Sequence, residues 1–365
     1  MTTSLLLSAA DTLDLGHWVA RDDHPGAVIG VLSRGHVRSW RSRGRGAVGE
    51  EAPRLTPTTV FYAASVSKQF TAACVALCEA AGDLDVTQSV RTYIPELPAV
   101  FDPVTLTYLL HHLGGLPRGR DDMAGAPSLT ADWWDGLGLW DLIAVLAKET
   151  DLAARPGERY AYSNAGYWLL AASVERVSGE RFGAFARRRL LEPLDMRDSR
   201  FRDDPDTPQP GLVIGHAAKD GLPTPVTTRF HGVGDGGLLT TIKDLAKWDL
   251  FWSGRSPLGA ELPERLVTQG RRNDGAWLSY AWGVSVRSHR GVRTVSHDGS
   301  YIGYRSKLVR FPHHDFSVAC LANADDVDVD GLSMDLADAV LGDLGDSPAP
   351  SWAETLRDDA LAMTD

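Results

Sequence analysis

Short apolar runs near both ends of the chain predict β-strands, whereas the middle carries apolar residues at the three-and-four spacing of amphipathic helices. Residues 27–32 and 36–40, separated by Ser33-Arg34-Gly35, predict a hairpin, and residues 58–62 predict a short strand. Further strands are expected at 282–286, 292–296, 306–311 and 317–321.

Helical periodicity begins with a short amphipathic segment at residues 5–20. It continues from Ser65 to Ala81, where Gly82 predicts the end of a helix. Residues 83 to about 230 are expected to be mostly helical, with long connections that contain Pro and Gly. The remaining predicted helices are 139–148, 164–178, 181–191, 242–253 and 331–341.

This order of elements predicts an α/β (α+β) fold, in which one antiparallel sheet flanked by helices carries an all-helical inserted domain. We expect a discontinuous α/β domain from residues 1–82 and 232–345, a helical domain from 83–231, and a tail or linker from 346–365. The segment after Gly345 contains Ser-Pro-Ala-Pro, which is typical of linkers. A ligand site would lie at the seam between the two domains.

Composition narrows the function mainly by exclusion. The formal net charge of -11 argues against a general binder of nucleic acids or anionic membranes. No stretch approaches the roughly 18 apolar residues of a membrane span. The N-terminal apolar run is about three residues long, against the roughly 7–15 of a signal peptide. We therefore expect a cytoplasmic protein with no nucleic-acid or membrane partner.

Ser65-Val66-Ser67-Lys68 is the first candidate for chemistry. Ser65 lies at the start of a predicted helix, where free N–H groups and the helix dipole favour developing negative charge. Lys68, one of only six lysines, falls on the same face one turn later. A lysine desolvated in an apolar pocket has a lowered pKa and can take the serine proton. The alternative is an N-cap serine followed by a solvent-facing lysine.

Tyr162-Ser163-Asn164 precedes a predicted helix and lies on a connection rather than in a core. The Tyr162 phenol can relay protons once neighbouring cations lower its pKa. The Asn164 amide can hold both a substrate carbonyl and a lysine. The alternative is a capping Ser or Asn beside a packed tyrosine.

His297-Asp298-Gly299-Ser300 is expected at the end of a strand. Gly299 would let a substrate backbone lie against the strand edge. The N–H that follows, that of Ser300, could pair with the N–H of Ser65 as an oxyanion hole. The alternative is an ordinary turn sequence.

Taken together in this order, the three motifs resemble those of the penicillin-recognising serine enzymes. The resemblance is to the branch that contains class C β-lactamases, DD-peptidases, D-aminopeptidases and family VIII-type esterases, and it covers roughly residues 10–345. Three further segments fit this branch: 109–117, 234–246 and Gly303-Tyr304.

The resemblance implies a β-lactamase/transpeptidase-like fold with the site between an α/β and a helical domain. It implies that Ser65 is the acylated nucleophile, Lys68 its activating partner and Tyr162 the proton relay to the leaving group. It also implies substrate contacts for a further four residues: Asn164, His297, Gly299 and Ser300. No metal or organic cofactor is implied.

Two departures from the family pattern bear on the substrate. His297 stands where many β-lactamases have lysine, and a histidine is mostly neutral at pH 7. Asp298 stands where the family has threonine, and an acid there would repel a substrate carboxylate. With the expected absence of an export signal, these features count against a periplasmic β-lactamase or a cell-wall carboxypeptidase.

Several other signals are interpreted as structural. Gly44/Gly46/Gly49 and Gly232/Gly234/Gly237 match Gly-x-Gly-x-x-Gly outside any strand-loop-helix unit, which argues against nucleotide binding. The adjacent pairs His111-His112 and His313-His314 are expected at the surface or in packing, not on a metal. Core packing is expected for a set of cysteines and tryptophans: Cys74, Cys78, Cys320, Trp133, Trp134 and Trp140. An aromatic acyl pocket is the alternative for the tryptophans.

The sequence therefore predicts a serine hydrolase that acts through an acyl-enzyme on Ser65 and cleaves a small-molecule or peptide ester or amide, including those of D-amino acids. One alternative is an acyltransferase or peptide cyclase that uses the same acyl-enzyme. Another is a catalytically silent binding protein on the same scaffold. The acyl group, the leaving group and the oligomeric state are left open.

Overall fold

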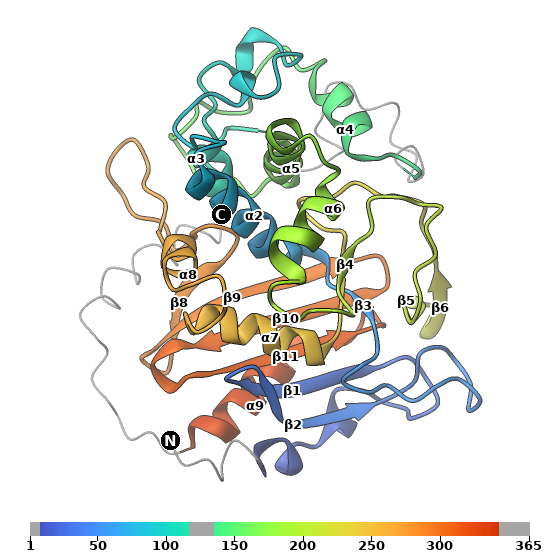
Figure 1. Cartoon of the computed structure of the whole chain (residues 1–365). Helices are drawn as coiled ribbons and strands as arrows, with labels where there is room; N and C mark the ends of the chain where they lie inside the picture. Colours follow the sequence, from blue (N-terminus) through green and yellow to red (C-terminus); the bar gives the residue numbers. More distant parts are fainter. Residues whose placement is uncertain (1–7, 117–134, 343–365) are drawn as a thin grey trace.

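The computed structural model describes residues 8–116 and 135–342 of the chain. Its centre is a six-stranded antiparallel sheet in the order β2-β1-β11-β10-β9-β8 (Figure 1). The strands are β1 (Ala27–Ser33), β2 (His36–Arg43), β8 (Ser285–His289), β9 (Val292–Tyr301), β10 (Tyr304–Phe311) and β11 (Phe316–Ala322). The two ends of the chain meet where Ala27 of β1 pairs with Ala322 of β11. The prediction of one antiparallel sheet built from both ends is confirmed.

Every residue of β1 and of β11 is buried, because helices cover the sheet on both faces. Alternate side chains of a strand point to opposite faces. Val28 and Leu32 of β1 accordingly join the core that contains α7 (Ile242–Trp252). Ile29 and Val31 join a separate core that contains α9 (Val329–Leu341).

The other helices lie mostly on the α7 side of the sheet, where α2 packs against α5 (Figure 1). Their bounds are α2 (Lys68–Ala81), α3 (Leu106–Leu110), α4 (Leu139–Leu146), α5 (Asn164–Ser178), α6 (Phe182–Ala186) and α8 (Glu261–Leu266). A π-helical turn, η7 (Arg187–Leu191), follows α6. The 3-10 turns are Ala9–Thr12, Leu15–His17, Ala64–Ser67, Val90–Thr92, Ala99–Phe101 and Pro312–His314.

Two small sheets correct the expectation that residues 83–230 are mostly helical. In the first, β3 (Phe61–Tyr62), β7 (Leu238–Thr240) and β4 (Arg200–Phe201) lie in the order β3-β7-β4. In the second, β5 (Gly215–Lys219) pairs with β6 (Leu222–Val226). The predicted helical segment thus contributes three strands, and its domain boundaries stay a prediction.

Two segments that were expected to form single helices are divided in the structure. Within the described part of residues 5–20 the backbone forms two 3-10 turns in place of one amphipathic helix, and the Asp14 side chain accepts the Gly16 N–H at 2.8 Å. Such a local side-chain bond competes with a continuous helix. Segment 181–191 divides into α6 and the π turn.

Cys74, Cys78 and Cys320 are buried free thiols, as predicted. Trp133, Trp134 and the tail 346–365 lie outside the described residues.

Candidate active site

Ser65 lies in a tight turn between β3 and α2. It is the only residue from Val60 to Cys78 that is not buried. The preceding Ala64 has a φ of 47°, a left-handed conformation that is unfavourable for a residue with a Cβ. Ser67 holds this turn, since its Oγ donates to the Ala64 carbonyl at 2.6 Å and accepts the Leu238 N–H at 3.1 Å. Strain of this kind gathers at functional sites, where surrounding structure stabilises it.

The Lys68 ammonium lies beneath Ser65 and is completely buried. Its Nζ donates to three oxygens: Ser65 Oγ at 3.2 Å, Asn164 Oδ1 at 2.8 Å and the Asp235 carbonyl at 2.9 Å. Burial lowers the pKa of Lys68 to about 8, and the charges of Asp235 and Asp298 oppose this shift. The alternative of a solvent-facing lysine is therefore wrong.

Tyr162 completes the contacts around Ser65. Lys68 Nζ lies 4.8 Å from the centre of its ring, and its phenol hydrogen-bonds the Ser65 side chain. Burial raises the pKa of Tyr162 well above its ordinary value, and the Ser65 hydrogen bond opposes this only partly. The expectation that nearby cations lower this pKa is wrong, because loss of hydration outweighs them. The phenol therefore keeps its proton at neutral pH.

Asn164 is the first residue of α5, whose bounds coincide with the predicted segment. Because its Oδ1 accepts from Lys68 at 2.8 Å, the amide nitrogen retains its donor capacity for another carbonyl. The structure thus joins Ser65, Lys68, Tyr162 and Asn164 in one hydrogen-bonded group.

His297 lies at the edge of this group on β9, with its ring centre 6.3 Å from that of Tyr162. Its Nδ1 is 2.6 Å from the Asp298 carbonyl, which can only accept, so this nitrogen carries the proton. Its Nε2 then accepts from the Tyr280 hydroxyl at 3.0 Å. Burial, followed by the charge of Lys68, lowers the pKa of His297 to about 4. The imidazole is therefore neutral at physiological pH.

Gly299 brings β9 against the turn that carries Ser65. A Cβ at this position would lie 2.5 Å from the Ala63 carbonyl oxygen and 3.0 Å from the Ala64 Cβ. The absence of a side chain therefore allows β9 to pack on this turn, and the role of Gly299 beside a substrate backbone stays a prediction. The next residue, Ser300, is exposed on the same strand.

His112 is a neighbour of Tyr162 that the sequence indicated only as a packing residue. Its ring centre lies 4.3 Å from that of Tyr162 and 4.6 Å from that of Tyr280. Its Nδ1 accepts the Ser163 N–H at 3.2 Å, and its carbonyl accepts the Ala161 N–H at 2.9 Å. His112 therefore holds the backbone on both sides of Tyr162. Burial lowers the pKa of His112 well below its ordinary value.

Asp235 is a second group that the sequence did not single out, although it lies within the segment 234–246 that fits the family branch. Its Oδ1 accepts the Trp168 indole N–H at 2.6 Å, and its own carbonyl accepts from Lys68. Burial raises the pKa of this carboxyl group, and the Lys68 charge opposes the shift. Asp235 is thus an acidic neighbour of the buried lysine, and its charge raises the pKa of Lys68.

Trp140 belongs neither to the core nor to this site. Its side chain is 39% exposed, its indole N–H donates to Glu175 Oε2 at 2.6 Å, and the Arg176 guanidinium lies 4.7 Å from its ring. The prediction that Trp140 packs in the core is wrong, because its indole instead contacts the Glu175 carboxylate and the Arg176 guanidinium on α5.

Across residues 8–116 and 135–342, no group of three or more His, Cys, Asp or Glu could hold a metal ion.

The fold and this site define a β-lactamase-type serine enzyme scaffold. The model of the Beta-lactamase family matches residues 15–342, and the chain belongs to this family. The resemblance to penicillin-recognising serine enzymes is thereby confirmed. In the parts of the chain that the structure describes, no helix combines the length and apolar character needed to cross a membrane.

Known relatives agree with this assignment. Penicillin-binding protein 4* of Bacillus subtilis (strain 168) is 28% identical over 315 residues, which cover 80% of this chain and 66% of the relative. A D-aminopeptidase of Gluconobacter oxydans (strain 621H) is 24% identical over 306 residues, covering 83% and 57%. The octameric penicillin-binding protein homologue from Pyrococcus abyssi matches with a TM-score of 0.78 at 25% identity, covering 94% of this chain and 79% of that one. The chain thus spans about three fifths to two thirds of the curated relatives.

Proposed function

We propose that this protein is a serine hydrolase that cleaves an ester or an amide through an acyl-enzyme on Ser65. The observation that carries the proposal is the pairing of the only accessible hydroxyl in the turn with a buried lysine, at 3.2 Å, whose pKa is lowered to about 8. Such a lysine is neutral often enough near pH 7 to accept a proton, which an ordinary surface lysine is not.

Acylation follows from this geometry. Neutral Lys68 takes the Ser65 proton as Oγ forms a bond to the carbonyl carbon of the substrate, and the carbonyl electron pair moves to its oxygen. The N–H groups of Ser65 and Ser300 would donate to that oxygen. When the tetrahedral intermediate collapses, Tyr162 gives its phenolic proton to the departing alcohol or amine, and protonated Lys68 returns a proton to Tyr162. The products are the Ser65 ester and the neutral leaving group, with the lysine neutral again.

Deacylation reverses the roles with water as the nucleophile. Tyr162 takes a proton from the water as its oxygen attacks the acyl carbon, and it passes its own phenolic proton to neutral Lys68. When the bond from Ser65 Oγ to that carbon breaks, protonated Lys68 returns a proton to Ser65 Oγ and the carboxylic acid is released. Asn164 would donate from its amide nitrogen to a substrate carbonyl, and β9 from His297 to Ser300 would position the substrate. The contacts around Ser65 support the roles of Lys68, Tyr162 and Asn164.

The neutral imidazole of His297 and the neighbouring Asp298 bear on the substrate. Neither supplies a permanent positive charge at the third motif, so this end of the site does not favour a carboxylate. This supports esters and amides over β-lactams with a free carboxylate at that position. The D-aminopeptidase relatives support amides of D-amino acids as one class of substrate.

The test is intact-protein mass spectrometry after exposure to p-nitrophenyl esters, D-amino-acid amides and a β-lactam. The wild type should gain the mass of the acyl group and lose it on turnover, whereas Ser65→Ala should do neither. Ser288→Ala, which removes an exposed serine from β8, is the matched control and should behave as the wild type. Product formation that persists in Ser65→Ala would overturn the mechanism. An acyl group that reaches an added amine in preference to water would identify a transferase.

A further inference from the structure

A cavity of about 220 Å³ opens beyond the end of β9. Three tyrosines form one side of it: Tyr62 lies 4.8 Å from Tyr301 and 5.9 Å from Tyr304 between ring centres. Two of these rings are fixed at their hydroxyls, since Tyr62 Oη accepts the Gly237 N–H at 2.9 Å and Tyr304 Oη donates to the Val213 carbonyl at 2.7 Å. The cavity therefore has a rigid aromatic floor.

Arg202 supplies a cationic wall to this cavity. Its Nη2 donates to the Thr228 carbonyl at 2.6 Å, while its buried Nε has no hydrogen-bond partner. Across residues 8–116 and 135–342, no carboxylate lies within the 4.0 Å of an ion pair with it. A partly buried guanidinium has lost part of its hydration. An anion bound beside it would offset this loss.

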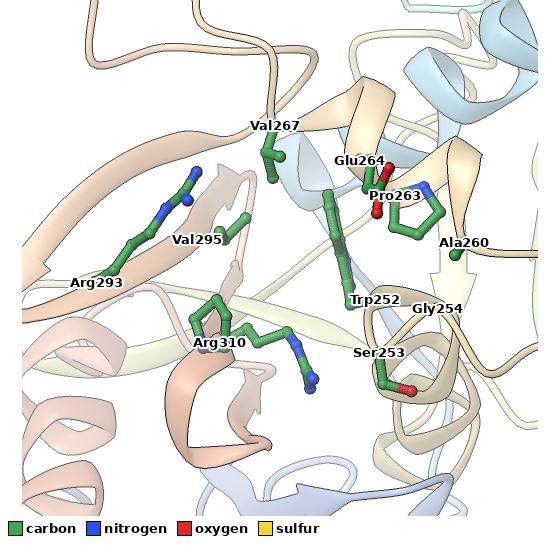
Figure 2. A pocket seen from close by; sticks show the side chains of 11 residues that line it. Trp252, Ser253, Gly254, Ala260, Pro263, Glu264, Val267, Arg293, Val295 and Arg310 are labelled. Atoms are coloured by element: carbon green, nitrogen blue, oxygen red, sulfur yellow. The ribbon is translucent and has the colours of Figure 1, made fainter. Parts of the chain in front are cut away.

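Another cavity, of about 190 Å³, is lined by an arginine whose charge is paired within the protein (Figure 2). It lies between α7, α8 and β9, and Arg310 lines it. Arg310 pairs with two carboxylates of the protein, those of Asp249 and Asp315. Its positive charge is therefore already compensated. This cavity also reaches Arg293, six residues before Gly299, which is roughly 20 Å along an extended strand.

The Arg202 cavity, by contrast, is close to Ser65. Gly299 packs against the Ala63 carbonyl, and Tyr301 follows two residues later, roughly 7 Å along the strand. His297 and Tyr162 lie toward the other end of β9. Because Tyr162 would protonate the leaving group, the leaving group departs toward His297. The acyl group then extends toward Tyr301 and the cavity.

We propose that this cavity is an acyl-side subsite for an anionic substituent, in which Arg202 binds a carboxylate above the three tyrosines. The substrate class is an ester or amide whose acyl group carries a second carboxylate at its far end, as in hemisuccinyl, hemiglutaryl or acidic amino-acyl groups. This inference rests on the proposed function. It locates recognition of a carboxylate at Arg202 rather than at the third motif.

The experiment compares two p-nitrophenyl esters of matched length, the hemiglutarate and its neutral methyl ester. The wild type should turn over the acid with a kcat/KM at least tenfold higher than the methyl ester, and this ratio should fall as salt is raised. Arg202→Gln should lower the ratio at least tenfold, and Arg202→Lys should retain part of it. Arg229→Gln removes the same charge from an exposed arginine that pairs with Asp206 and should leave the ratio unchanged.

The outcomes separate this inference from the function on which it depends. A wild type that hydrolyses the methyl ester through Ser65 but shows no preference for the acid would overturn the anionic subsite alone. Failure to hydrolyse either ester, with no acyl adduct, would overturn the proposed function. Because the wild-type ratio is itself decisive, the test holds even where Arg202→Gln does not fold. A preference that Arg202→Gln retains in full would assign the carboxylate to another residue.

Discussion

Replacing Asp235 by asparagine tests how the site sets the proton affinity of Lys68. Asparagine keeps an oxygen that can accept from Trp168 and removes the negative charge. The Asp235 carbonyl is 2.9 Å from Lys68 Nζ, so the carboxylate of the same residue lies within about 8 Å of Nζ. At an effective dielectric constant of about 20, this separation corresponds to about 2 kcal/mol, or between one and two pKa units.

The sign follows from the charges. The Asp235 carboxylate raises the pKa of Lys68, so its removal lowers that pKa from about 8 to roughly 6–7. In the wild type, Lys68 is neutral in roughly one molecule in ten at pH 7. The value of kcat/KM should therefore fall about tenfold for each pH unit below 8. In Asp235→Asn, more than about half should be neutral at pH 7, so a larger fraction of the plateau activity is reached there.

The assay is kcat/KM for a p-nitrophenyl ester from pH 5.5 to 9.5, with each profile scaled to its own alkaline plateau. Asp220→Asn, in the exposed turn between β5 and β6, is the control and should keep the wild-type profile. An Asp235→Asn profile whose acid limb stays in place or moves to higher pH would refute the electrostatic reasoning. A wild-type profile without any inflection between pH 6 and 9 would refute the role of Lys68 as the base.

Two further predictions concern side chains that support the site. His112→Ala should lower kcat at least tenfold with little change in KM, because it removes the Nδ1 that accepts the Ser163 N–H beside Tyr162. His112→Asn restores an acceptor and tolerates the φ of 57°. This second variant should recover much of the lost kcat and keep the same pH profile. Equal kcat in all three proteins would exclude this positioning role. Gly299→Ala should cost about 1–3 kcal/mol of stability and lower the Tm, since its Cβ meets the Ala63 carbonyl at 2.5 Å. Gly166→Ala, whose nearest atoms lie at 3.6 Å, is the control, and equal Tm values would contradict the packing argument.

The elements that the sequence predicted well are those whose signal is local. The apolar runs of β1 and β11 are continuous because both faces of these strands are covered, and α5 has its predicted bounds. The residues from Ser65 to Lys68 lie within one turn, so their spacing alone indicates that the two side chains can meet. Tyr162 and Asn164 required the resemblance to a family, because nothing local links them to Lys68.

The features that the sequence could not predict depend on distant partners. Arg200–Phe201 forms a strand only because β7 offers its backbone some 40 residues later. The Tyr280 hydroxyl meets His297 across the end of the sheet, and no spacing indicates this pair. The pKa of Tyr162 is raised because burial outweighs the nearby cation, and the sequence shows the cation but not the burial. Burial arises from the whole fold, so a local sequence pattern does not reveal it.

The hydrogen bond from Ser306 Oγ to the Ala63 carbonyl, at 2.7 Å, bears on how the chain folds while it is being synthesised. It ties the turn that carries Ser65 to β10, because Ser306 is synthesised 243 residues after Ala63. A nascent chain that has emerged only as far as α5 already contains Ser65, Lys68, Tyr162 and Asn164 but lacks the strands that hold them. If Ser65 is acylated as proposed, this reactivity should therefore appear only after β9 and β10 leave the ribosome.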